Sequence, residues 1–304
     1  MNYKAILNQV FTESKAYAEE GNVASYIPEL SRIDPDKFGI YMIDKNYKHF
    51  ELGDSLEKFS IQSISKAFTL PIAFSILGEK IWKRVGVEPS GTSFNSIVQL
   101  EYEKGIPRNP FINAGALVVA DILLSHLKNP KEYLLSFVRS LGQDEDINYD
   151  PKVAESEKET GYHNASLVNQ LKAYGNIENR CEEVLDFYYH QCSLSMNCKQ
   201  LAQSFTPYAS LKTPFDYESI KLSRSQVKRI NAILLSCGFY DESGEFAFKV
   251  GLPGKSGVGG GIIAFHPNEY SIAVWSPKLN KKGNSARGMK ALELFTTLSG
   301  QSIF

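Results

Sequence analysis

Segments with the composition of β-strands lie near both ends of this chain, and helical segments fill its middle. β-Branched and aromatic residues, bounded by turn residues, predict strands over 37–44, 49–54, 245–251, 259–267 and 270–277. Apolar residues three and four positions apart predict helices over most of the remaining chain. One helix begins at 63, and the others cover about 3–20, 114–127, 130–141, 152–159, 164–174, 178–191, 197–206, 223–236 and 284–299.

This order predicts an α/β (α+β) fold in which the two ends of the chain share one antiparallel sheet. The first and last helices pack against that sheet, and the central helices form a lobe inserted between its strands. No repeat or linker-like tract divides the sequence, so we expect a single domain over 1–304. The α/β lobe takes about 1–62 and 238–304, and the helical lobe takes about 63–237. A cleft between two such lobes is a natural ligand site.

The composition argues against several classes of partner. The 33 Lys and Arg residues nearly balance the 34 Asp and Glu residues, so no global field attracts nucleic acid or an anionic membrane. No stretch reaches the roughly 18 uninterrupted apolar residues of a membrane span. The N-terminus lacks the apolar core of a secretory signal, so a cytoplasmic protein is expected. Four cysteines lack the spacing of a zinc site and are expected to be buried, reduced thiols: Cys181, Cys192, Cys198 and Cys237.

The stretch "FSIQSISKAFTL" places Ser63 and Lys66 three residues apart at the start of an apolar helix. Residues at this spacing lie on one helix face, about 5–6 Å apart at Cβ. A serine hydroxyl needs a base to become a nucleophile, and a lysine whose pKa is lowered by burial can be that base. The alternative is structural: Ser63 or Ser65 caps the helix, and Lys66 is a solvated residue of its first turn.

A second motif lies in "GLPGKSGVGGG", where Lys255, Ser256 and Gly257 precede a predicted strand. Alone, such a stretch is also typical of an ordinary glycine-rich turn. A Ser-x-x-Lys helix start followed downstream by Lys-[Ser/Thr]-Gly is the signature of penicillin-binding proteins and serine β-lactamases. The two motifs together therefore predict a serine acyl-transfer enzyme.

Longer blocks narrow this prediction to a family. They include "YIPEL", "QSISKAF", "NPFINAGALV", "ESEKETGYHN" and "SCGFYDESGEFAFKVGLPGKSGVGGGI", and they span about residues 20 to 265. In sequence and order these blocks resemble the serine-dependent, β-lactamase-like glutaminases, which hydrolyse L-glutamine to L-glutamate and ammonia. The resemblance implies a β-lactamase / D,D-peptidase-like fold, no metal or organic cofactor, and assembly as a homodimer or homotetramer.

The resemblance also implies a role for individual residues. Ser63 corresponds to the nucleophile and Lys66 to its proton acceptor, while Tyr188 and Tyr240 match two active-site tyrosines. The implied substrate-binding residues are Tyr26, Gln62, Ser63, Asn113, Glu157, Asn164, Tyr188, Tyr240 and Val258. Physically, a carboxylate suits the α-ammonium of glutamine, and amide and phenol donors suit its α-carboxylate. Backbone N–H groups of Ser63 and Val258 would form an oxyanion hole. Taken singly, these residues also fit solvated helix faces, caps and core tyrosines.

Two features of the predicted site stay open at the level of sequence. The chain has no Ser-Asp-Asn element, so we expect Tyr188 or Tyr240 to take its role, and either could relay the Ser63 proton. The positive charge of Lys255 is expected to depress the pKa of Lys66.

Other interpretations are also compatible with the motifs. The chain could be a β-lactamase or D,D-peptidase, although the N-terminus shows no export signal for substrates that lie outside the cytoplasm. It could also be a binding module that keeps the pocket without turnover. The polar stretch 90–109 fits a mobile activation loop or a plain surface loop.

Overall fold

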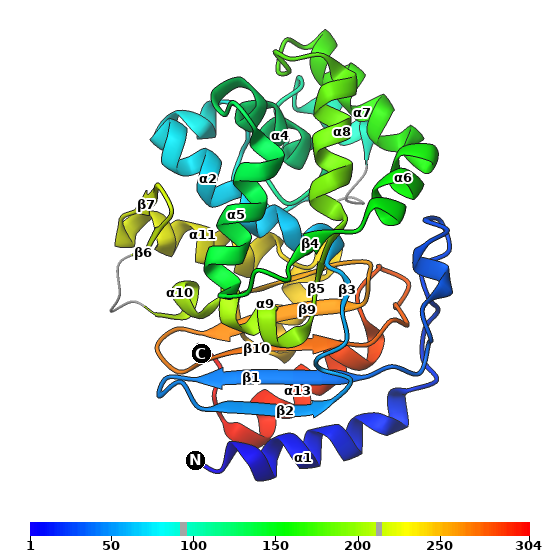
Figure 1. The fold of residues 1–304 in the computed structure, drawn as a ribbon, viewed down its shortest axis with the longest axis vertical. Coiled ribbons are helices and arrows are strands. Elements are labelled where there is room, and N and C mark those ends of the chain that lie inside the picture. Colours follow the sequence, from blue (N-terminus) through cyan, green and yellow to red (C-terminus); the bar gives the residue numbers. More distant parts are fainter. Residues whose placement is uncertain (92–95, 211–214) are drawn as a thin grey trace.

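The ends of the chain meet in one five-stranded antiparallel sheet, as predicted. The computed structural model describes residues 1–91, 96–210 and 215–304. The strand order is β2-β1-β10-β9-β8, and the blue and orange strands of Figure 1 lie side by side. The strands are β1 (Gly39–Asp44), β2 (His49–Gly53), β8 (Gly254–Ser256), β9 (Gly261–His266) and β10 (Tyr270–Trp275). β1 pairs directly with β10, so the sheet cannot form until both ends of the chain are present.

Alternation along these strands divides the core into two layers. Ile40 and its partner Val274 point to one face of the sheet, where α1 (Tyr3–Glu13) and α13 (Ala286–Ser299) pack. Tyr41 and its partner Ala273 point to the other face and join the core of the helical region. The period of two in side-chain direction explains this division. The terminal helices therefore cover the sheet as expected, although the first one ends in a 3₁₀ turn, η1 (Ser14–Tyr17).

The prediction of a strand over 245–251 is wrong. Residues 243–249 form the helix α12 (Ser243–Lys249), and the third C-terminal strand is β8. Apolar residues at 246, 248 and 250 suggested the period of a strand, but Phe246 and Val250 also share one helix face. Both are buried, whereas Phe248 is 89% exposed. Phe246 stacks on Phe239, a tertiary contact that local periodicity does not reveal.

The other predicted helices are confirmed, and several short elements join them. The remaining helices are α2 (Lys66–Leu77), α3 (Ile97–Tyr102), α4 (Asn113–His126), α5 (Pro130–Gly142), α6 (Pro151–Thr160), α7 (Tyr162–Ala173), α8 (Cys181–Cys192), α9 (Cys198–Ser204), α10 (Thr206–Ala209) and α11 (Arg224–Cys237). The short 3₁₀ turns are η2 (Leu30–Arg32), η3 (Gln62–Ser65), η4 (Gly78–Lys83) and η5 (Tyr240–Glu242). Two small sheets were not predicted: β3 (Phe59–Ser60), β5 (Leu194–Met196) and β4 (Asn148–Tyr149), and the hairpin of β6 (Phe215–Tyr217) and β7 (Ile220–Leu222). α9 and α10 pack on the sheet and α11 contacts β8, whereas most of the other central helices lie farther from the sheet (Figure 1).

Two further expectations concern a membrane-spanning helix and the polar stretch 90–109. Within the described ranges, no helix combines the length and the apolar character needed to cross a membrane. Residues 92–95 of the predicted activation loop lie outside those ranges. The described part of 90–109 contains α3, so the role of this stretch stays a prediction.

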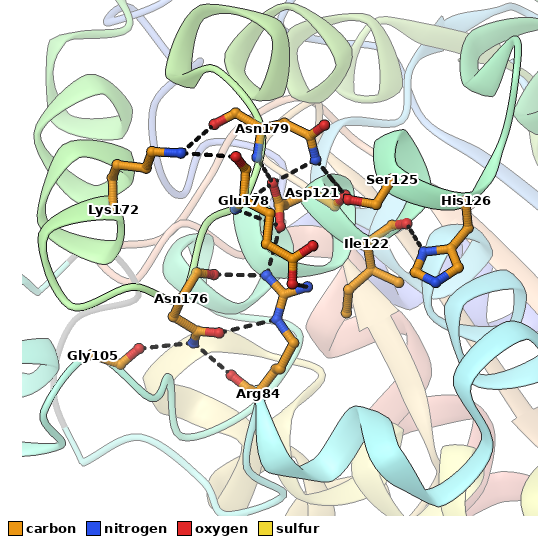
Figure 2. A network of polar contacts seen from close by, with 10 residues as sticks. All are labelled: Arg84, Gly105, Asp121, Ile122, Ser125, His126, Lys172, Asn176, Glu178 and Asn179. Carbon is orange, nitrogen blue, oxygen red and sulfur yellow. Dashed lines mark hydrogen bonds and ion pairs between the residues drawn. The ribbon is translucent and has the colours of Figure 1, made fainter.

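A buried acidic side chain fastens α4 to two neighbouring segments (Figure 2). Asp121 is fully buried, and its carboxylate accepts hydrogen bonds from Arg84 Nη2 (2.6 Å), Asn179 N (2.9 Å) and Glu178 N (3.1 Å). Arg84 also donates to Asn176 O (2.8 Å). Both oxygens of the Asp121 carboxylate accept hydrogen bonds and one is paired with Arg84, so this carboxylate can be buried without an unsatisfied charge. The network holds the helix whose first residue is Asn113.

Replacing Asp121 should test this network. We expect Asp121→Asn to lower the free energy of unfolding by about 3 kcal/mol at neutral pH, because it removes the buried partner of Arg84 and leaves only the exposed Glu178, 3.6 Å away. Burial opposes ionisation of Asp121, but the hydrogen bonds from Arg84, Asn179 and Glu178 outweigh it and hold its pKa below the usual value. Its contribution is therefore fully present above about pH 4 and is lost as pH falls through the lower folded-state pKa. Urea titrations at several pH values measure it.

The matched control removes an exposed ion pair. Asp186→Asn breaks the contact with Lys131, where the Asp186 side chain is 49% exposed, and should cost less than about 1 kcal/mol. Equal losses for the two variants, or a loss at Asp121 that does not depend on pH, would contradict the assignment.

Candidate active site

A cavity of about 430 Å³ opens between the central helices and the loop that precedes β9. Its walls come from η3, the start of α4, and α6, α7 and α8, together with two loops. The lining residues are Tyr26, Ile27, Gln62, Ser63, Asn113, Glu157, Thr160, Gly161, His163, Asn164, Tyr188, Cys192 and Val258. Eight of the ten predicted site residues line this cavity, and the other two, Lys66 and Tyr240, contact residues of its wall. Segments far apart in the sequence thus converge on one small polar chamber.

Ser63 lies in the short turn η3, between strand β3 and helix α2, and the backbone just before it has an unfavourable conformation. Gln62 has a φ of 51°, in the left-handed region that bulky residues seldom occupy. Its Nε2 donates to Ser60 Oγ (2.9 Å), and that hydroxyl donates to Cys192 O (2.9 Å). The turn η3 then runs directly into α2. Ser63 lies inside this turn and Ser65 makes no side-chain cap bond, so the capping interpretation is wrong.

The glycine-rich loop 257–260 lies directly against the backbone that leads to Ser63. A Cβ atom at Gly257 would lie 2.3 Å from Ile61 O, and one at Gly259 would lie 2.0 Å from Ser60 O. Only glycine permits this approach, because such contacts exclude any side chain. The approach brings Val258 into the wall beside Ser63. Among the described residues, neither the Ser63 N–H nor the Val258 N–H has a hydrogen-bond partner.

Lys66 is buried in the wall behind Ser63 rather than solvated. Its Nζ donates to Phe111 O (3.1 Å) and to Asn113 Oδ1 (2.7 Å), and Asn113 Nδ2 donates to Asn164 Oδ1 (3.0 Å). Burial penalises the charged form and lowers the pKa of Lys66 to about 8, although Cys192 and Glu157 act in the opposite direction. A substantial fraction of this amine is therefore neutral near physiological pH. Asn113 couples it to the cavity.

The two tyrosines occupy different places. The Tyr240 hydroxyl lies close enough to the side chains of Ser63 and Ser256 for them to oppose the effect of burial on its pKa, whereas the Tyr188 hydroxyl lies close to the Cys192 thiol. Burial raises the pKa of both phenols above the usual value, so both are protonated at neutral pH. Tyr240 is therefore the tyrosine next to the predicted nucleophile. Tyr188 lines the cavity together with Ser63.

Lys255 is buried beside Tyr240, and it is not the main cause of the lowered pKa of Lys66. It is fully buried on β8, and its Nζ donates to Gly238 O (3.0 Å) and Ser256 O (2.7 Å). Its Nζ also lies 4.6 Å from the centre of the Tyr240 ring. Burial, followed by the charge of Lys66, holds the pKa of Lys255 well below its usual value. Burial, rather than the charge of Lys255, is the cause that lowers the pKa of Lys66.

The carboxylate of Glu157 and the carboxamide of Asn164 also line the chamber. Glu157 is buried on α6, and burial raises its pKa to about 7 against the effects of Gln62 and Lys66. Asn164 follows on α7. Tyr26 lies in the wall with 57% of its surface exposed, as expected at an entrance. A small ligand with both an amine and a carboxylate would meet complementary groups here.

Several wall residues were not singled out from the sequence. Thr160, Gly161 and His163 lie between Glu157 and Asn164, inside a block already noted, and that position was their only signal. All four cysteines are free, and Cys192, Cys198 and Cys237 are buried as expected, whereas Cys181 is only partly buried. Cys192 nevertheless lines the cavity, and burial raises its pKa to about 12, so it is protonated and a poor nucleophile. Across the described residues, no group of three or more His, Cys, Asp or Glu side chains is placed to hold a metal ion.

Comparisons with known proteins agree with this geometry. The glutaminase family model matches residues 21–304. The chain is 56% identical over 304 residues to a glutaminase of Christiangramia forsetii and 54% identical to one of Saccharophagus degradans, and it covers at least 99% of each. Among solved structures, a probable glutaminase, ybaS, superposes with a TM-score of 0.92 at 31% identity, over 99% of this chain and 98% of that one.

A second solved structure is a probable glutaminase of Bacillus subtilis complexed with 6-diazo-5-oxo-L-norleucine. It has a TM-score of 0.86 at 30% identity and covers 97% of this chain and 94% of its own. The sheet, the inserted helices and these likenesses together establish the β-lactamase-like fold expected from the motifs. On the evidence of the family model and of relatives matched along their whole length, the chain belongs to the glutaminase family of enzymes.

Proposed function

We propose that this chain hydrolyses L-glutamine to L-glutamate and ammonia through an acyl-enzyme on Ser63, with Lys66 as general base. The observation that carries the proposal is the buried Lys66, whose pKa of about 8 leaves part of the amine neutral one helical turn from Ser63. A neutral amine can accept the serine proton, whereas a solvated lysine cannot do so efficiently near pH 7. Membership of the glutaminase family supports the choice of substrate.

The substrate would be held at its α-carbon by the wall opposite the nucleophile. Glu157 would pair with the α-ammonium, and the charge of that ammonium would favour the ionised carboxylate. Asn113, Asn164 and the Tyr188 hydroxyl would donate to the α-carboxylate. Tyr26 and Gln62 would complete the chamber. Holding both ends of the amino acid places the side-chain amide toward Ser63, which lowers the entropic cost of attack.

The chemical steps follow from the groups around Ser63. As Ser63 Oγ attacks the amide carbon, its proton passes to Lys66, and the Tyr240 hydroxyl in contact with Ser63 can relay it. The N–H groups of Ser63 and Val258, which have no partner among the described residues, are suited to donate hydrogen bonds to the developing oxyanion. The C–N bond breaks as the leaving nitrogen takes a proton, releasing ammonia. Water then attacks the γ-glutamyl ester, and Ser63 regains its proton.

We further propose that residues 1–304 act as one catalytic domain, in the cytoplasm, as a homodimer or homotetramer. Pairing of β1 with β10 supports a single unit, since neither end of the chain completes the sheet alone. The assembly and the location rest on the resemblance to the family. Light scattering on the purified chain distinguishes a dimer or tetramer from a monomer.

Removing the nucleophile tests the reaction. We expect Ser63→Ala to lower kcat for ammonia release from L-glutamine by at least about 10³-fold, with the thermal midpoint little changed. L-Asparagine serves as a second substrate, and Ser65→Ala, a neighbouring buried serine, is the matched control with activity within a few-fold of wild type. Full activity in Ser63→Ala, or no glutamine hydrolysis by wild type, would defeat the proposal.

The pH dependence should report Glu157 and Lys66. Glu157 must be ionised to attract the α-ammonium, and Lys66 must be neutral to accept a proton, so acid impairs both. With pKa values of about 7 and about 8, kcat/KM should rise with pH from 6 through 8, because kcat/KM reports the free enzyme. In Glu157→Gln the step near pH 7 should disappear while the step near pH 8 stays. A kcat/KM that falls over this range would contradict both assignments.

Phenylalanine variants should separate the two tyrosines. We expect Tyr240→Phe to lower kcat by about 10²-fold or more with little change in KM, because it removes the hydroxyl in contact with Ser63. Tyr188→Phe should mainly raise KM, because its hydroxyl faces the substrate. Steady-state kinetics on both variants decide the matter, and the opposite pattern would make Tyr188 the relay.

A further inference from the structure

The backbone at Tyr240 adopts a conformation that the residue itself does not favour. Its φ is 55°, in the left-handed region where a bulky aromatic residue is a rare occupant. Such strain persists only where the surrounding structure imposes it. The side chain contacts Ser63, so whatever imposes the strain also sets the position of the phenol.

Two residues outside the cavity, Asn284 and Glu242, hold the backbone around Tyr240 in place. Asn284 Nδ2 donates to Phe239 O (3.3 Å), just before Tyr240, and to Glu242 Oε2 (2.5 Å), just after it. Both partners are acceptors, so the orientation of the Asn284 amide is fixed by its surroundings. Asn284 is fully buried and Glu242 is nearly so. We refer to Asn284 and Glu242 as the Tyr240 clamp.

The loop that carries Asn284 is itself rigidly held. Asn280 N donates to Asn284 O (2.7 Å), and Asn280 Oδ1 accepts from Asn284 N (3.1 Å), which closes the loop on itself. Asn280 Nδ2 also donates to both carboxylate oxygens of Glu242 (3.1 and 2.9 Å). The next residue, Ser285, caps α13 and donates to Ser276 O (2.7 Å). The clamp therefore transmits the position of α13 and the end of β10 to Tyr240.

We propose that Asn284 and Glu242 are positioning residues that hold the Tyr240 hydroxyl against Ser63 and thereby set the rate of proton transfer. This inference rests on the proposed function, in which Tyr240 relays the Ser63 proton. Neither residue lines the substrate cavity, so both act through Tyr240 rather than on glutamine. Their loss should therefore lower kcat and leave KM nearly unchanged.

A double-mutant cycle tests this directly. Asn284→Ala should lower kcat about 10- to 100-fold, because a catalytic group displaced by about an ångström loses that much rate. In a Tyr240→Phe background the same change should cost almost nothing further, since the group it positions is already absent. A purely structural role for Asn284 would instead lower kcat by the same factor in both backgrounds.

Asn231→Ala is the matched control. Asn231 Nδ2 donates to Tyr208 O (3.0 Å), and its Oδ1, like that of Asn284, has no partner among the described residues. This variant should lose a similar buried contact and keep kcat and KM. If Asn284→Ala proves too unstable to assay, Glu242→Gln keeps the size and one acceptor oxygen. It should lower kcat several-fold, again only when Tyr240 is present.

The outcomes separate this inference from the proposed function. Wild type that releases no ammonia from L-glutamine overturns the function and the clamp with it. The inference about the clamp alone is overturned if wild type is active, Tyr240→Phe is impaired, and Asn284→Ala or Glu242→Gln is unimpaired. It is also overturned if the fold-losses in kcat of Asn284→Ala and Tyr240→Phe multiply in the double variant, or if Tyr240→Phe is fully active. Non-additive losses in kcat at constant KM support it.

Discussion

The burial of Lys66 is the constraint on which the active site depends. An ammonium removed from water is stable only if its donors find acceptors, and even then its neutral form is favoured. Phe111 O and Asn113 Oδ1 provide those acceptors, so the start of α4 must stay fixed beside α2. The Asp121 network fastens α4 to its neighbours, and Asn113 extends the contact to Asn164. A single buried amine thus links the packing of the central helices to the reactivity proposed for Ser63.

Close backbone approach and local strain complete the site. Gln62 and Tyr240 both adopt left-handed conformations. Gln62 donates a buried hydrogen bond to Ser60 in its own segment, and the backbone beside Tyr240 accepts one from Asn284. The glycine loop 257–260 comes too near Ile61 and Ser60 to tolerate side chains. These features come from segments far apart in the sequence, and the pairing of β1 with β10 helps to bring them together. The sheet that brings the termini together therefore also assembles the catalytic groups.

Sequence reasoning succeeded where a pattern had one physical explanation and failed where tertiary contacts chose between two. The alternating strands and the amphipathic helices were predictable because their periods differ. The stretch around Phe246 fits either period, and stacking on Phe239 selects the helix. The cavity residues were accessible through family motifs, whereas Cys192 and Asn284 gave no local signal of their surroundings. The lowered pKa values of Lys66 and Lys255 likewise result mainly from burial, which the motif does not encode.

The most direct test of the central claim is to trap the acyl-enzyme. Enzyme turning over L-glutamine is quenched in acid, and its intact mass and its proteolytic peptides are measured by mass spectrometry. The account predicts a mass increase of one γ-glutamyl group on the peptide that contains Ser63, and no such adduct in Ser63→Ala. Efficient turnover in wild type with the adduct on another residue, such as Cys192, would contradict it.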